Sequence, residues 1–140
     1  MKRFRPYRIS QEIRDRYADV SLHPSDFIYP YFVVEGKGIK EPVASMEGVF
    51  RFSVDELLRD LEALSIRQID KILLFGVIPP EKKDETGSEG LSPDSIVCRA
   101  VRAVKRRFPG IIVFTDVCLC EYTSHGHCGI IRGHDVENDA

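Results

Sequence analysis

The hydrophobic residues of this chain gather in three runs of strand length, at residues 27–34, 72–77 and 111–117. Aromatic and β-branched side chains dominate the first run, as in many strands. Pro30 interrupts this run, and proline is typical of strand starts and edges. The second and third runs are almost continuously apolar, like parallel strands covered on both faces. The pattern therefore predicts three strands, of which the last two are buried.

Helical spacing of apolar residues predicts one helix after each of the first two strands. The first helix begins with Ser53 and Glu56, which have the spacing of a capping box. Its apolar face consists of Leu57, Leu58, Leu61 and Leu64. The second helix is predicted to begin with Ser92 as its N-cap and Pro93 at its first helical position. Each helix thus has a start signal and an apolar face.

The order strand, helix, strand, helix, strand suits parallel pairing, because the crossovers are long enough. Three parallel strands leave a hydrophobic edge unpaired, so the pattern looks like the opening of a longer fold. We predict an α/β fold comprising the first three strand–helix units of a (β/α)8 TIM barrel, incomplete at this length. An N-terminal arm occupies residues 1–20, with a short amphipathic helix within residues 8–20. The N-terminal part of a single TIM-barrel domain follows at residues 21–140.

Two segments show no regular pattern. Residues 79–91 are charged and lack apolar periodicity, which fits either a lid or a solvated loop. Gly87 and Gly90 in this segment do not have the spacing of a phosphate-binding loop. From Glu121 onward the chain is polar and rich in glycine, so we expect no further element there.

The composition narrows the class of protein. The chain has 140 residues, of which 43% are hydrophobic and 30% charged, and a formal net charge of -2. These values exclude collagen-like and disordered chains. No apolar run approaches the roughly 18 to 20 residues of a membrane span, and no apolar signal-peptide core follows the basic N-terminus. We expect an unprocessed cytoplasmic protein that binds neither nucleic acid nor membranes, with its function in a local site.

Three of the four cysteines cluster after the third strand, at Cys118, Cys120 and Cys128. Alternation along a strand would project Asp116, Cys118 and Cys120 to one side at the carboxyl end, where parallel α/β proteins build their sites. The glycine-containing loop that follows can return Cys128 to the same point. Three thiolates suit zinc. Cys98 lies on the apolar face of the second helix, where we expect a small buried thiol.

The neighbouring residues do not decide whether a metal site here is structural or catalytic. Either His125 or His127 would close the site as a fourth ligand, whereas a water molecule there would leave the ion accessible to substrate. Each histidine is also typical of a loop hydrogen-bonding group. Asp116 fits either a supporting role, in which it orients a ligand or a metal-bound water, or a cap of the turn, and we favour the supporting role slightly.

The string DVCLCEYTSHGHCG at residues 116–129 closely resembles the zinc-binding segment of the porphobilinogen synthase (5-aminolevulinate dehydratase) family. Three further strings are similar to the family in the same order, so the resemblance covers nearly the whole chain from about Arg5. They are FIYPYFVVEGKGIKEPVASMEGVFRFSVDELL, KKDETGSEG and FPGIIVFTDVCLC. The resemblance implies a lyase (hydro-lyase) that condenses two 5-aminolevulinate molecules into porphobilinogen, with loss of water, in tetrapyrrole and heme biosynthesis. It also implies a (β/α)8 barrel whose arm wraps a neighbouring subunit in a homo-octamer.

The same resemblance implies roles for individual residues. It places the zinc ligands at Cys118, Cys120 and Cys128, as in the zinc-dependent branch of the family. It makes Asp116 a catalytic support group and His127 a ligand of a second, weaker metal site found in some members. Zinc in such a site acts as a Lewis acid toward the second substrate. Whether magnesium serves as an allosteric ion is left open.

The family's reaction also depends on two lysines that form Schiff bases on later strands. The lysines of this chain fall outside those motifs; they are Lys2, Lys37, Lys40, Lys71, Lys82, Lys83 and Lys105. We therefore expect no Schiff-base lysine here, and we expect the 140-residue chain alone to be inactive. The alternative from another class is a stand-alone structural zinc-binding module closed by three cysteines and a histidine.

Overall fold

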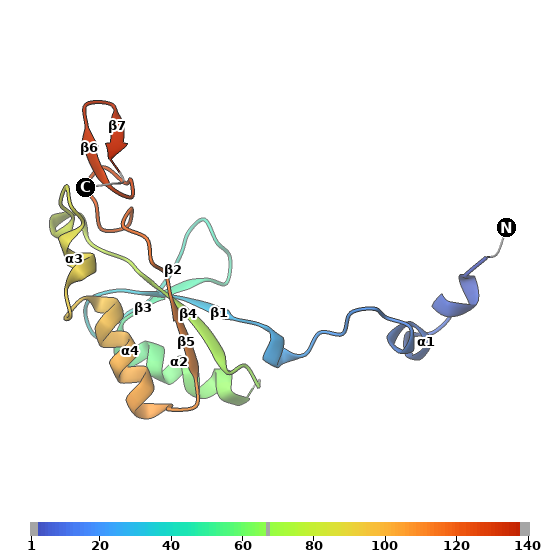
Figure 1. Cartoon of the computed structure of the whole chain (residues 1–140). Coiled ribbons are helices and arrows are strands. Elements are labelled where there is room, and N and C mark those ends of the chain that lie inside the picture. Colours follow the sequence, from blue (N-terminus) through green and yellow to red (C-terminus); the bar gives the residue numbers. More distant parts are fainter. Residues whose placement is uncertain (1–2, 67, 138–140) are drawn as a thin grey trace.

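A five-stranded sheet forms the centre of the structure, a computed structural model that describes residues 3–66 and 68–137. The strands are β1 (Tyr29–Val33), β2 (Lys40–Pro42), β3 (Phe50–Phe52), β4 (Lys71–Gly76), β5 (Ile112–Thr115), β6 (Ile130–Arg132) and β7 (Asp135–Glu137). The helices are α1 (Gln11–Arg16), α2 (Val54–Ile66), α3 (Ser88–Leu91) and α4 (Ile96–Arg107), with 3-10 turns η1 (Arg5–Arg8), η2 (Pro24–Asp26) and η3 (Pro80–Lys82). The order in the sheet is β2-β3-β1-β4-β5, and β6 pairs with β7 alone (Figure 1).

The strands β1, β4 and β5 pair in parallel, and they correspond to the three hydrophobic runs of the sequence. In the pairing of β1 with β4, Tyr29 lies opposite Ile72, and in that of β4 with β5, Lys71 lies opposite Ile112. The chain passes through α2 before β4 and through α4 before β5, which makes both connections helical crossovers. The prediction of a parallel α/β fold is confirmed.

The hydrophobic core lies between this sheet and the two long helices, which also pack against each other. The fully or almost fully buried side chains from the strands are Tyr31, Val33, Phe52, Ile72 and Leu74, and those from the helices are Leu57, Leu61, Leu64, Ile96, Ala100 and Val104. Alternate residues of β4 are buried, and Leu73 and Phe75 on its other face are half-buried. The core therefore covers one face of β4 fully and the other only in part.

Both helix starts differ in detail from the prediction. Ser53 Oγ accepts from the backbone N–H of Ile39 at 2.9 Å and donates to Asp55 at 2.6 Å. Glu56 pairs with Arg59, so the reciprocal bonds of a capping box are replaced by bonds that tie α2 to the preceding loop. The second helix, α4, begins a turn later than predicted, because Ser95 rather than Ser92 caps it, accepting from the N–H of residue 98 at 3.4 Å.

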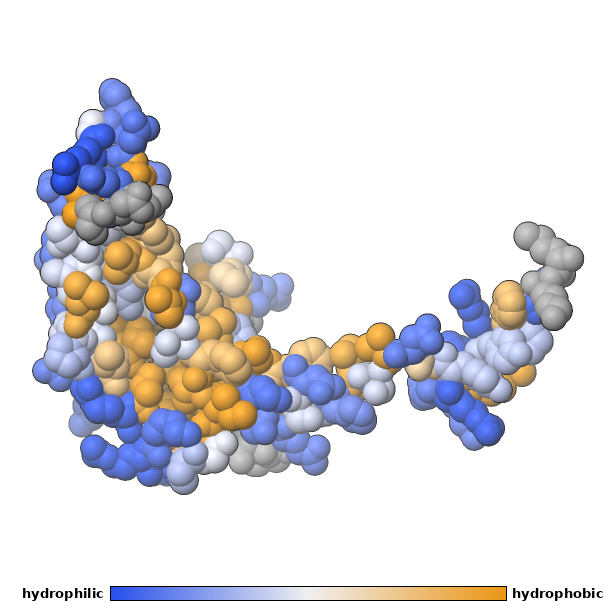
Figure 2. All heavy atoms as spheres, in the orientation of Figure 1, coloured by the Kyte–Doolittle hydropathy of each residue, from blue (hydrophilic) through white to orange (hydrophobic). Residues whose placement is uncertain are grey.

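The prediction that the third strand is buried is wrong. In β5, Ile112 is 47% exposed and Phe114 is 41% exposed. Within the part of the chain that the structure describes, β4 is the only strand that pairs with β5, so one edge and one face of β5 lack a covering element. Figure 2 shows apolar side chains gathered over the region where β5 lies in Figure 1.

Four short strands were not predicted. β2 and β3 form an antiparallel pair, in which Lys40 lies opposite Phe52, and β3 also pairs in parallel with β1. The polar C-terminal segment, for which we expected no element, forms the hairpin of β6 and β7 around Gly133. Each of these strands has three residues, too few for a hydrophobic period to be recognised.

The N-terminal segment leads away from the sheet, with α1 near its far end (Figure 1). The helix α1 is shorter than the predicted segment, and Ser10 caps it by accepting from the N–H of Ile13 at 3.2 Å. The segment's base is fixed to the sheet, because Lys71 at the start of β4 donates to the carbonyl of Ser25. Among the described residues, no helix has the length and apolar character needed to cross a bilayer.

Candidate metal centre

The three clustered cysteines meet at one point beyond β5. Their sulfur atoms are 2.6 Å apart for Cys118 and Cys120, 3.1 Å for Cys118 and Cys128, and 3.6 Å for Cys120 and Cys128. Sulfurs bound to one zinc ion at about 2.3 Å lie at most about 4.6 Å apart, and all three pairs meet this limit. In the described part of the chain they form the one group of three or more metal-ligating side chains within 4.8 Å of one another. Their donor set suits a soft or borderline cation.

The sulfurs come together in a turn that follows β5, not on the strand itself. The strand β5 ends at Thr115, before the first cysteine, and Val117 is 97% exposed. The carbonyl of Leu119 then accepts from the N–H groups of Tyr122 and Thr123 at 2.9 and 3.0 Å, which closes a turn around the thiols. The predicted convergence is therefore present, with the cysteines beyond the end of the strand and Cys128 returned by the loop.

Hydrogen bonds within the cluster shift the pKa values of Cys118 and Cys128 in opposite directions. The hydrogen bond with Cys120 raises the pKa of Cys118 to about 12. The hydrogen bond from Cys118 lowers the pKa of Cys128 to about 7, and backbone N–H groups of Leu119 and Cys120 act in the same direction. Cys128, the exposed thiol of the cluster, therefore loses its proton more readily than Cys118.

The two histidines lie in the same loop, but His125 is occupied by hydrogen bonds. Its Nε2 lies 3.0 Å from the carbonyl oxygen of Glu85, and its Nδ1 accepts from the N–H of His127 at 3.2 Å. A carbonyl oxygen only accepts, so Nε2 carries the proton and both ring nitrogens of His125 are used. The ring of His127 stacks on that of His125 at 5.9 Å. Neither ring belongs to the group of converging ligand atoms.

Two carboxylates flank the thiols. Asp116 lies exposed directly after β5, and its N–H reaches the carbonyl of Leu74 at 3.5 Å. Glu121, which sequence reasoning missed, is half-buried, and this burial raises its pKa; the charge of Asp116 adds to the rise and Lys83 opposes it. The structure thus brings Asp116 near the cysteine turn without a bond to any of the three sulfurs.

A pocket of about 230 Å³ adjoins this turn at the carboxyl ends of β1 and β4. Its polar lining comes from Arg51, Lys83 and Glu121, and its apolar lining includes Phe32 and Met46. Among the described residues, Arg51 and Lys83 have no ion-pair partner. The pocket therefore holds one more positive than negative side chain.

Residues 79–91 contain η3 and α3, and they dock on the cysteine turn. The backbone of Asp84 forms a parallel bridge with Thr123, donating to the carbonyl of Tyr122 at 3.3 Å and accepting from Ser124 at 2.8 Å. In Figure 1 the segment that carries α3 runs beside the chain between β5 and β6. The sequence contains a local signal for the turn at residues 84–88, since Asp followed by Thr and Ser at two-residue steps is typical of turns, but it contains none for the docking.

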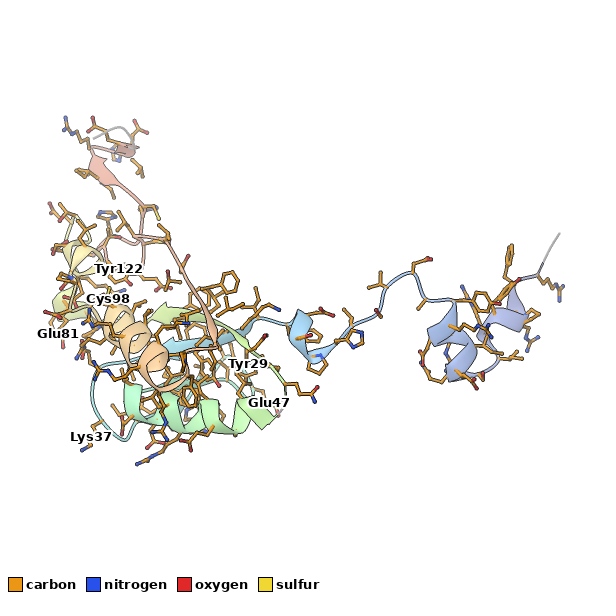
Figure 3. The ribbon with its side chains drawn as sticks, turned by 60° about the horizontal axis from the view of Figure 1, so that its bottom comes forward. Tyr29, Lys37, Glu47, Glu81, Cys98 and Tyr122 are labelled. Atoms are coloured by element: carbon orange, nitrogen blue, oxygen red, sulfur yellow. The ribbon has the colours of Figure 1, made fainter. Side chains whose placement is uncertain are left out.

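Tyr122 joins the cysteine turn to the hydrophobic core. It is 9% exposed, and its burial raises the pKa of its phenol. A Cβ placed on Gly90 would lie 3.1 Å from the Tyr122 ring, and one placed on Gly76 would lie 3.2 Å from the Tyr122 hydroxyl. In Figure 3, Tyr122 lies close to Cys98, the remaining thiol, which is half-buried on α4 rather than fully buried as predicted.

Three of the described lysines, Lys40, Lys82 and Lys105, lack the surroundings of a reactive amine. A Schiff-base lysine needs a lowered pKa. The hydrogen bond to Glu35 raises the pKa of Lys82 instead. Lys40 pairs with Asp60 at 2.9 Å, and Lys105 donates to the carbonyls of residues 109 and 111 at 2.7 and 2.9 Å.

With this parallel sheet and this thiol cluster, the chain is an α/β protein that carries a candidate metal centre beyond the ends of its strands. The family model of delta-aminolevulinic acid dehydratase matches residues 1–140, and the chain belongs to that family. Because the match extends over the entire chain, it does not favour a stand-alone zinc-binding module.

Relatives and a solved structure agree with this family. The chain is 45% identical over 139 residues to delta-aminolevulinic acid dehydratase from Helicobacter pylori (strain J99), a match that covers 99% of this chain and 42% of the relative. It is 40% identical over 139 residues to the enzyme of that name from Ruminiclostridium josui, covering 99% of this chain and 67% of the relative. The chain thus spans less than half of the first of these relatives.

The fold resembles a crystal structure of delta-aminolevulinic acid dehydratase (porphobilinogen synthase) from Toxoplasma gondii, in complex with the reaction product porphobilinogen. The TM-score is 0.91 at 30% sequence identity, over 99% of this chain and 40% of that chain. The described sheet and helices are therefore similar to the corresponding part of that enzyme.

Proposed function

We propose that this chain is part of a porphobilinogen synthase, which condenses two 5-aminolevulinate molecules into porphobilinogen with loss of water. Membership of the delta-aminolevulinic acid dehydratase family supports this activity. So does the likeness to a solved relative in complex with porphobilinogen. The main structural observation in support of a metal-assisted mechanism is the convergence of three thiols beyond the ends of the parallel strands.

Cys118, Cys120 and Cys128 would hold a zinc ion. The donor set and the short sulfur separations support this choice. His125 uses both ring nitrogens elsewhere, which favours a fourth position filled by water or substrate rather than by this histidine. A zinc ion bound there supplies Lewis-acid chemistry toward a substrate oxygen. We keep His127 as a candidate ligand of a second, weaker metal site, and we assign no residue to an allosteric magnesium ion.

The chain's own residues would bind and orient substrate. Arg51 and Lys83 complement the carboxylate of 5-aminolevulinate from the pocket beside the cysteine turn. Asp116 accepts hydrogen bonds from polar groups bound near the thiols, as a catalytic support residue. We assign the Schiff-base amines to no lysine of this chain, since Lys40 pairs with Asp60 and the hydrogen bond to Glu35 raises the pKa of Lys82.

The proposed enzyme is a cytoplasmic homo-octamer of (β/α)8 barrels. The strands β1, β4 and β5 are the first three barrel strands, and the exposed apolar side chains of β5 suit the pairing and packing of a fourth. The N-terminal arm, residues 1–20, would contact a neighbouring subunit. Its exposed apolar side chains support this role; they include Phe4, Ile9 and Tyr17.

Porphobilinogen formation by the full-length protein tests the proposal. The parent protein and the Cys98→Ala variant should both convert 5-aminolevulinate, whereas Cys118→Ala should lose at least about a hundredfold in rate, because removal of a metal ligand abolishes Lewis-acid assistance. Cys98 is the matched control, as a thiol outside the cluster. Absence of porphobilinogen from the zinc-loaded parent protein would refute the activity. Equal rates for Cys118→Ala and Cys98→Ala would refute the role of the cluster.

A further inference from the structure

We infer that Asp84 is a positioning residue for the metal centre, and that residues 79–91 act as a support which holds the cysteine turn in its metal-binding arrangement. This inference rests on the proposed function, because it concerns the same thiols. It assigns a role to a segment that contains no metal ligand.

The Asp84 side chain organises the support. One carboxylate oxygen accepts from the N–H of Thr86 at 3.0 Å, from its hydroxyl at 3.1 Å and from the N–H of Ser88 at 3.0 Å. The other oxygen accepts from the Ser88 hydroxyl. These bonds hold the pKa of Asp84 well below its usual range. Four donors on one carboxylate fix the path of the backbone between residues 84 and 88, where Gly87 adopts a φ of +68°.

The Asp84 backbone transmits this geometry to the cysteine turn. Its carbonyl accepts from Ser124 at 2.8 Å and its N–H donates to Tyr122 at 3.3 Å, across the parallel bridge to Thr123. The side chain of Thr123 is almost fully buried, and its hydroxyl donates to the carbonyl of His127 at 3.0 Å. His127 directly precedes Cys128. A continuous set of bonds therefore runs from the Asp84 carboxylate to the cysteine that must fold back to complete the site.

Side-chain packing adds a second connection. A Cβ on Gly87 would lie 3.4 Å from both Leu119 and Thr123, which is van der Waals contact, so the support lies directly against the turn. Leu119 lies between the two cysteines Cys118 and Cys120 in the sequence. A shift of the support by the width of one methyl group would therefore displace the residue that spaces these two sulfurs.

The far end of the support is fixed to the sheet and to α4. Lys82 pairs with Glu35, directly after β1, at 3.1 Å and with Glu89 of α3 at 3.7 Å. Arg99 of α4 pairs with the same Glu35. Surface pairs of this kind contribute little stability individually, but together they define where the segment lies. The support is thus held at one end by ion pairs and at the other by the cysteine turn.

Zinc binding by full-length protein tests the role of Asp84. Groups that orient metal ligands typically change metal affinity by about 10- to 100-fold when removed. We expect Asp84→Ala to weaken zinc binding by at least about tenfold in a chelator competition, and to change the sulfur-to-metal charge-transfer spectrum of the cobalt-loaded protein. The matched control is Glu81→Gln, an exposed acidic residue of the same segment (Figure 3) that makes no hydrogen bond or ion pair among the described residues. This control should bind zinc and cobalt as the parent does.

A second variant guards against general misfolding. Thr86→Val combined with Ser88→Ala removes both hydroxyl donors but keeps the Asp84 backbone pairing, so it should fold and lose zinc affinity by several-fold. Parental zinc affinity and cobalt spectrum in this double variant and in any folded Asp84→Ala protein would overturn the inference. Equal losses in Glu81→Gln would overturn it as well. Failure of the parent protein to bind zinc would instead contradict the proposed function.

Discussion

His125 donates its Nε2–H to the carbonyl oxygen of Glu85 at 3.0 Å, which joins the loop of the cysteines to the segment before α3. The other ring nitrogen of His125 accepts from the N–H of His127 at 3.2 Å. A histidine that ligates a metal must keep one ring nitrogen for the ion. In this arrangement both ring nitrogens of His125 are used in hydrogen bonds, which favours an exchangeable fourth ligand in the proposed zinc site.

The first prediction concerns metal binding by the His125→Gln variant. Because His125 orients the loop without touching the ion, this variant should keep the cobalt spectrum of the parent and lose less than about tenfold in zinc affinity. Cys128→Ser, which removes a ligand, should lose far more and should alter the spectrum. Cobalt absorption and chelator competition on the full-length proteins give both values. Loss of a nitrogen ligand in His125→Gln would contradict the open site.

The close approach of α3 to Tyr122 provides a second prediction. Gly90→Ala places a methyl group 3.1 Å from the ring of Tyr122, a buried side chain that must shift to accommodate it. We expect a loss of about 1–3 kcal/mol in the free energy of unfolding, as for other overpacked sites. Gly110→Ala is the control, since no atom lies within 4 Å of its added Cβ. Denaturant unfolding compares the two, and equal stability would show that α3 does not pack as described.

The pH dependence of the support is the third prediction. Hydrogen bonds from Ser88 and Thr86 lower the pKa of Asp84 below the ordinary 3.8. A carboxyl group with a lowered pKa in the folded state stabilises that state above its unfolded pKa, and this stabilisation disappears as the pH falls below about 4. Hydrogen exchange of residues 84–91, corrected for the intrinsic pH effect, should show protection at pH 6 that declines toward pH 3. In Asp84→Asn the protection should be lower and independent of pH over this range. A parallel decline in both proteins would contradict the assignment.

Protection of thiols by zinc is the fourth prediction. In metal-free protein, alkylation should modify Cys128 first, because it is the most exposed thiol of the cluster. Addition of one equivalent of zinc should slow the alkylation of Cys118, Cys120 and Cys128 together, by at least about tenfold, since bound thiolates are shielded by the ion. Cys98 on α4 is the internal control, and its rate should not change. Mass spectrometry of peptides measures the four rates; protection of Cys98 alone, or of none, would contradict the site.

The sequence was sufficient for the elements that have a clear hydrophobic period or a distinctive residue type. The apolar run around Ile72 and Leu74 predicted β4, and the spacing of Leu57 and Leu61 predicted the buried face of α2. Residue chemistry predicted the thiol cluster, because three cysteines so close in sequence need little more than a tight turn to meet. These features depend on residues that are close together in the sequence, so they can be predicted from the sequence alone.

Features that depend on distant contacts were missed. Nothing in the sequence pairs Asp84 with Thr123, so the docking of residues 79–91 on the cysteine turn was not predicted. The exposure of Phe114 follows from the absence of a second strand beside β5 in the described residues, and its apolar character alone suggested burial. Ser95 replaced Ser92 as the cap of α4, because tertiary packing selects among several serines that have equal local propensity.

The central claim is that three cysteines hold the zinc that porphobilinogen formation requires. The most direct test is a zinc titration of the metal-free full-length protein, in which bound zinc per subunit and the rate of porphobilinogen formation are measured on the same samples. We predict that the rate rises in proportion to zinc bound and reaches its maximum when the site formed by Cys118, Cys120 and Cys128 is filled, with no rise in Cys118→Ala. A full rate before any zinc is bound would contradict the claim.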